Sequence, residues 1–109
     1  MPFDEALAAR VRRRLHHERG VAEKRMFGGI AFLVDGNMCC GVHRSELIVR
    51  LHAEHAERAL REPGARVFDL SGRPMKGWVL VDSPALEDER VLAGWLGLAL
   101  ANARSLPPK

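Results

Sequence analysis

Apolar residues recur at every second position near the middle of the first half of the chain. Ile30, Phe32 and Val34 are β-branched or aromatic, and this two-residue period fits the pleat of a β-strand. The residues between them are also apolar. We therefore predict a central strand that is at least partly covered on both faces.

A hairpin and a third strand follow from the same alternation. Asp35-Gly36 favours a type I′ turn, because both turn positions need a positive φ and glycine adopts it without steric cost. The return strand is predicted over Asn37–His43, which would place Cys39 and Cys40 on opposite faces. A further strand is expected over Leu47–Leu51.

Three stretches carry apolar residues at helical spacing. The first is predicted over Phe3–Arg19 with Asp4 as its N-cap, and the second over Ala53–Glu62. The third begins with Ser83 as the expected N-cap and ends before Pro107, because proline cannot continue a helix. This last helix is the longest, so we expect it to cover much of the sheet.

Two more strands are predicted between the second and third helices, over Arg66–Leu70 and Met75–Asp82, with turn residues 71–74 between them. Trp78 and Trp95 lie in apolar patterns, so we expect both in the core. The order α-β-β-β-α-β-β-α predicts a two-layer α+β fold, with an antiparallel sheet of about five strands and helices packed on it. Residues 1–109 are expected to form one domain.

The composition indicates more about the cellular location of the protein than about its function. The chain has 17 basic and 14 acidic residues, a net charge of +3. It contains no apolar run of the roughly 18 residues that a membrane helix needs, and its first residues do not resemble a signal peptide. We therefore expect a cytoplasmic protein without membrane association.

The basic residues gather on the first predicted helix, where Arg10, Arg12, Arg13 and Arg14 lie close together. Such a cluster could contact the phosphates of a nucleic acid. It could equally be a solvated helix face, since no base-reading motif accompanies it and aromatic residues for stacking are few. Nucleic-acid binding through residues 10–14 is therefore the alternative hypothesis, not the favoured one.

The adjacent cysteines are predicted to be thiols, because a bridge between neighbours forces a strained ring. We expect Cys40 in the core and Cys39 partly exposed. Cys39 and His43 would share a strand face about 13 Å apart, too far for a nucleophile and its base. A thiol-based activity at Cys39 would need a base from elsewhere, and it remains the second alternative.

No cofactor or metal site is predicted. The chain lacks a Cys-x2-Cys motif, and His52 and His55 lie among charged residues typical of a solvated surface. Phe27-Gly28-Gly29 could bind an anion through backbone N–H groups. It leads into a strand, however, where glycine commonly relieves crowding, and we favour that structural role.

Several short motifs in a fixed order resemble one known family. They are Arg25-Met-Phe-Gly-Gly29, Val34-Asp-Gly36 with Met38, Gly41-Val42, Leu47-Ile-Val-Arg-Leu51, Pro74-Met-Lys-Gly-Trp-Val79 and Ser105-Leu-Pro-Pro-Lys109. Over nearly its whole length the chain is similar to short single-domain members of the TfoX N-terminal domain family. The structural motif comprises Met26, Phe27, Gly28, Gly29, Asp35, Gly36, Gly77 and Trp78.

The resemblance implies an α+β fold similar to secretion-chaperone-like domains. It also implies a link to transcriptional control of natural competence, in which longer members act as coactivators with the cAMP receptor protein. It implies no catalytic residue. We therefore expect a non-enzymatic adaptor that binds an unknown protein partner, and a homodimer is compatible with the sequence. The expected partner-binding residues are Arg12, Arg13, Arg14, Arg25, Cys39 and His43.

Overall fold

The computed structural model describes residues 3–26, 28–70 and 73–109, and within them it confirms an α+β fold. Six strands form one antiparallel sheet in the order β1-β2-β3-β4-β6-β5. The strands are β1 (Val21–Met26), β2 (Gly29–Val34), β3 (Asn37–His43), β4 (Glu46–Arg50), β5 (Ala65–Leu70) and β6 (Arg73–Val81). The helices are α1 (Glu5–Leu15), α2 (Ala53–Ala59), α3 (Ser83–Leu86) and α4 (Glu89–Ser105).

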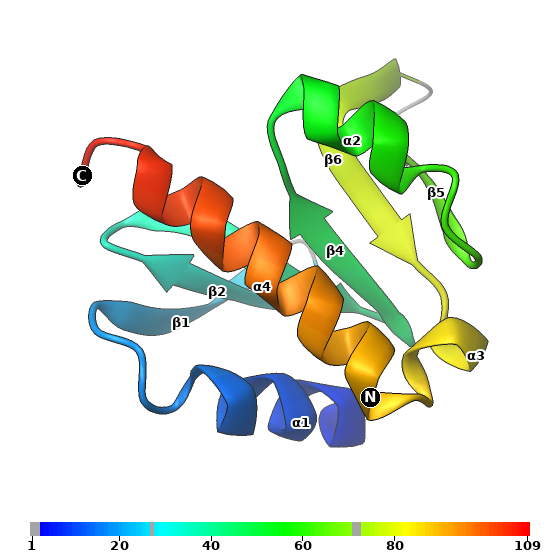
Figure 1. Ribbon diagram of the computed structural model, residues 1–109. Coiled ribbons are helices and arrows are strands. Elements are labelled where there is room, and N and C mark those ends of the chain that lie inside the picture. The colour runs from blue at the N-terminus through cyan, green and yellow to red at the C-terminus, as the bar shows by residue number, and fades with distance from the viewer. Residues whose placement is uncertain (1–2, 27, 71–72) are drawn as a thin grey trace.

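The helices gather on one face of the sheet, and α4 runs diagonally across it (Figure 1). The main core lies between these layers and joins residues of β2, β3, β4 and β6 to α1, α2 and α4. Phe32, Leu47 and Leu92 are fully buried there, and Trp95 is 5% exposed, as predicted. No helix in the described part of the chain is long and apolar enough to cross a membrane.

A second, smaller apolar cluster lies on the opposite face of the sheet. Ile48, Leu80 and Phe68 are buried there, with Met38, Met75 and Trp78 packed around them. Within the described residues this cluster contains no helix residue. Trp78 is therefore only half-buried on the open face, not part of the main core as expected.

Strand β1 is the element that the sequence did not indicate. It pairs antiparallel with β2, with Val21 opposite Val34 and Met26 opposite Gly29. Its four central residues are exposed, so it carries no apolar alternation. Charged side chains on such a strand protect the sheet edge from pairing with another chain. The sheet therefore has six strands where about five were predicted.

Cys40 lies in the core as expected, but the prediction that the two cysteines point to opposite faces is wrong because β3 contains a bulge. Phe32 pairs with Cys40 whereas Leu33 pairs with Met38, which leaves Cys39 as an extra residue in the ladder. A bulge of this kind interrupts the strict alternation of side chains. Both cysteines consequently belong to the core on the helix side of the sheet.

The helix ends differ from the predicted ones in three places, one of which is α2, where the helix ends at Ala59 rather than Glu62. Asp4 caps α1 as expected and accepts a hydrogen bond from the Leu7 N–H at 3.0 Å, but α1 ends at Leu15 rather than Arg19. Asp82, not Ser83, caps the next helix. A second cap at Asp88 then begins α4, so the predicted third helix is two helices.

The turns agree better with expectation. Asp35 and Gly36 have φ values of 52° and 86°, as the predicted type I′ turn requires. Arg73 and Pro74 belong to β6 and not to a turn. Phe27, Ser71 and Gly72, on which other predictions fall, lie outside the described residues.

The last residues of the chain are attached to the β2–β3 turn. The Asn37 side-chain amide donates a hydrogen bond to the Pro107 carbonyl at 2.9 Å. The Lys109 N–H donates to the Asp35 carbonyl at 2.8 Å. The tail after α4 therefore packs along the hairpin.

Candidate functional site

The arginines of α1 are engaged in ion pairs that fix this helix to the fold. Arg12 makes a two-pronged contact with Glu23 of β1, at 2.6 and 2.8 Å. Arg10 and Arg14 both bind Glu89 at the start of α4. Three of the guanidinium groups predicted to meet an external partner are thus paired within the protein, while Arg13 is exposed on α1.

These pairs also set the ionisation of their carboxylates. Hydrogen bonds from Arg10 and Arg14 lower the pKa of Glu89. The hydrogen bond from Arg12 lowers the pKa of Glu23. Both carboxylates are therefore held in the charged form, as a stabilising contact between α1 and its neighbours requires.

The predicted partner-binding residues do not form one surface. The residues of α1 lie on the helix side of the sheet. His43 is the register partner of Glu46 in the β3–β4 ladder and shares the opposite face of the sheet with Gly41 and Ile48. The guanidinium of Arg25 stacks on the ring of Phe3, 5.3 Å from its centroid.

Cys39 is fully buried, which corrects the expectation of a partly exposed thiol. The hydrogen bond with Cys40 lowers the pKa of Cys39, and the same bond together with burial raises the pKa of Cys40. A thiol that reacts with an external substrate must be reachable as well as ionised. Neither thiol is on the surface of the folded protein.

In the described part of the chain, no three His, Cys, Asp or Glu residues are grouped so that they could hold a metal ion. The rings of His52 and His55 lie edge to face with centroids 5.9 Å apart. His52 Nε2 is 3.1 Å from the Ser105 hydroxyl, so the two histidines are attached to the end of α4 through His52.

The glycine motif has a structural role in the hairpin. A Cβ on Gly29 would lie 2.2 Å from the carbonyl oxygen of Val42, so any side chain would collide with the neighbouring strand. Gly28, with φ +73°, and Met26 flank this close approach. The geometry favours a strand start over an anion-binding loop, as the sequence suggested.

The open sheet face is the first candidate surface, defined by Ile48, Leu80, Phe68, Met38, Met75 and Trp78. Charged groups border it: the Arg50 guanidinium lies 5.6 Å from the centroid of the Trp78 ring, and Arg66 forms an ion pair with Glu46. A hollow of about 300 Å³ adjoins it beside α2. Val67, which lines this hollow, is 41% exposed.

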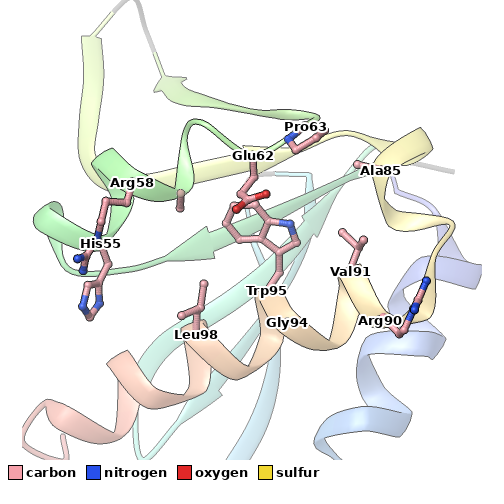
Figure 2. A pocket seen from close by; sticks show the side chains of 11 residues that line it. His55, Arg58, Glu62, Pro63, Ala85, Arg90, Val91, Gly94, Trp95 and Leu98 are labelled. Carbon is pink, nitrogen blue, oxygen red and sulfur yellow. The ribbon is translucent and has the colours of Figure 1, made fainter.

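A larger pocket of about 660 Å³ lies between α2, α3 and α4 (Figure 2). Trp95 projects from α4 into it, with Val91 and Leu98 on either side and Glu62 above the indole. This pocket was not predicted from the sequence. The spacing of residues along α4 does not show which other helices face Gly94 and Leu98, so the sequence carried no signal for the pocket.

A comparison of the chain with protein-family models identifies its family. The model of the TfoX N-terminal domain matches residues 13–103. The chain belongs to the TfoX N-terminal domain family. No curated protein matches it, and no solved structure does. In this TfoX N-terminal domain the matched region runs from within α1 almost to the end of α4, so it includes the whole sheet and both candidate surfaces.

Proposed function

We propose that this TfoX N-terminal domain is a non-catalytic regulatory module that binds another protein through its open sheet face. The observation that supports this proposal is the second apolar cluster, which has a buried centre and a half-buried margin with no helix residue among its described members. A sheet face of this kind ordinarily packs against another layer. A partner protein would supply that layer.

The margin of the face suits protein recognition. Met38 and Met75 are flexible and adapt to varied surfaces, and tryptophan is enriched among residues that dominate binding energy. The hollow beside Trp78 offers a pocket for an apolar anchor from the partner. Arg50, Glu46 and Arg66 around the face supply charges that orient the partner.

The family is linked in general to the regulation of competence, and we propose that the partner acts in that transcriptional control. Removing the gene should lower the transformation frequency of the native cell. Restoring the gene should rescue it. Unchanged transformation would overturn the competence link but would leave the binding of a partner to be judged separately.

Two exposed apolar residues provide a matched test of the surface. Val67 lies opposite Val79 on the helix side of the sheet, but it lines the hollow that Met75 and Trp78 of the open face also line, and it is 41% exposed. Leu98 lines the α4 pocket instead and is 46% exposed. A charge placed among apolar contacts is costly. Val67→Glu should therefore weaken partner capture at least about tenfold, while Leu98→Glu should leave it unchanged.

The measurement is affinity purification from the native cell, with circular dichroism to show that both variants fold. Equal capture by the two variants, or loss only with Leu98→Glu, would contradict the use of the hollow beside the open face. Failure of the wild type to capture any reproducible partner would contradict the adaptor function itself.

A further inference from the structure

The pocket between α2, α3 and α4 has the size and lining of a small-molecule site. Its volume of about 660 Å³ lies within the roughly 300–1,000 Å³ that is usual for ligand pockets. Ala59, Ala85, Val91 and Trp95 form an apolar floor, and Leu98 stands exposed at the mouth. An apolar body of a ligand would bury these surfaces.

One buried polar group opens into this pocket. Trp95 is 5% exposed, and among the described residues its indole N–H has no hydrogen-bond partner. Every fully buried side-chain nitrogen or oxygen in those residues nevertheless has a hydrogen-bond partner. The indole N–H is therefore not sealed in the core but reaches the pocket, where it can donate to a ligand.

Charges at the rim indicate the sign of the ligand. His55 and Arg58 of α2 lie together at one end, Arg90 lies at the other, and Glu62 stands over the indole between them (Figure 2). Arg90 is paired with Asp88 at 3.3 Å, whereas no ion pair of the described residues includes Arg58. The α2 end of the rim is therefore cationic and spatially separate from Glu62.

We propose that this pocket binds an amphipathic carboxylate, with its apolar body on the Trp95 floor and its carboxylate at Arg58. A planar guanidinium suits a carboxylate because it donates two parallel hydrogen bonds. Glu62 disfavours an anion over the centre of the pocket, so the ligand is oriented with its charged end toward α2. The site is separate from the open sheet face and does not depend on the proposed adaptor function.

Two exposed glycines of α4 allow a matched test. A Cβ at Gly94 or Gly97 would meet nothing within 4 Å, and a larger residue has a higher helix propensity than glycine. Only Gly94 lines the pocket. Gly94→Leu should therefore fill the site without harming the fold, and Gly97→Leu is its control on the same helix.

The probe is decanoate, with decylammonium as the matched cation of equal chain length. Binding is followed by the fluorescence of Trp95 in a Trp78→Phe background, which removes the other indole, and by calorimetry. Decanoate should bind at least about tenfold more tightly than decylammonium, because one charge-assisted contact is worth that factor. Arg58→Gln should remove most of this preference.

Gly94→Leu should abolish decanoate binding, and Gly97→Leu should preserve it. Equal affinity for the two probes would overturn the carboxylate specificity, and decanoate binding that survives Gly94→Leu would overturn the location. Absence of binding by the wild type at millimolar decanoate would overturn the proposal as a whole. None of these outcomes bears on partner capture at Val67.

Discussion

Gly29 and Cys39 show how contacts across the sheet decide what a single residue can be. The Phe-Gly-Gly motif indicated a crowded strand start from sequence alone. That the crowding comes from the Val42 carbonyl, on another strand, required the strand register. At Cys39 the two-residue alternation failed, because one extra residue in β3 turns the following side chains by one position. Local sequence carries no signal for such a bulge.

Replacing Gly29 by alanine should destabilise the protein. The added Cβ would lie 2.2 Å from the Val42 oxygen, so β2 and β3 would have to separate. Overpacking of this kind costs about 1–3 kcal/mol of unfolding free energy. Urea unfolding measures it, and Gly97→Ala, which meets no atom, should leave the midpoint equal or higher. An unchanged midpoint in Gly29→Ala would show that the strands are not in the observed register.

Helix α1 illustrates what can and cannot be predicted for an element. Its apolar stripe, its cap at Asp4 and its basic face were evident in the sequence. The carboxylates that pair with the arginines, Glu23 and Glu89, are separated from them by 11 to 79 residues along the chain. The sequence therefore could not show that these arginines form ion pairs within the protein. The break between α3 and α4 was also hidden, since no glycine or proline marks it.

The contact between α1 and α4 should make stability depend on acid pH. Because the pKa of Glu89 is lowered in the folded protein by Arg10 and Arg14, its contribution is complete above the unfolded pKa near 4.5 and is lost as pH falls through the folded value. Glu89→Gln should therefore flatten the decline in unfolding free energy below pH 4.5. Chemical unfolding at several pH values measures this.

Glu54→Gln provides the control for that experiment, because Glu54 is an exposed glutamate on α2. It should leave the acid slope close to that of the wild type. If both substitutions changed the slope equally, the effect would belong to overall charge and not to the contact between α1 and α4.

For the whole molecule, the two-layer architecture and the meander of β2, β3 and β4 could be predicted, because both depend on apolar periodicity. Strand β1 could not, because an exposed edge strand has no such periodicity. Of the candidate site, the sequence showed Trp78 and Leu80 on one face of a strand, but not that this face is open. The α4 pocket could not be predicted from the sequence, because it is formed where three helices meet.

The two thiols should report unfolding of the entire protein. Both lie fully buried between the sheet and the helices, so an alkylating reagent can reach them only when these layers separate. Labelling by N-ethylmaleimide should be suppressed on the order of 10³-fold or more relative to the unfolded chain. It should rise with urea in step with loss of helical circular dichroism, as measured by mass spectrometry.

Labelling of Cys39 in the native state at the rate of an unfolded thiol would contradict this expectation. It would show that the helical layer opens locally, and it would revive a thiol-based activity. Labelling of both cysteines together, only above the unfolding midpoint, would end that hypothesis.

The anchored tail has a practical consequence for anyone who attaches a reporter to this protein. The Lys109 N–H donates a hydrogen bond to the Asp35 carbonyl. A fluorophore or tag fused after Lys109 would therefore begin at the tip of the β2–β3 hairpin. Such a label would stand at a defined corner, useful for distance measurements by energy transfer. It would also loosen if the hairpin tip were displaced.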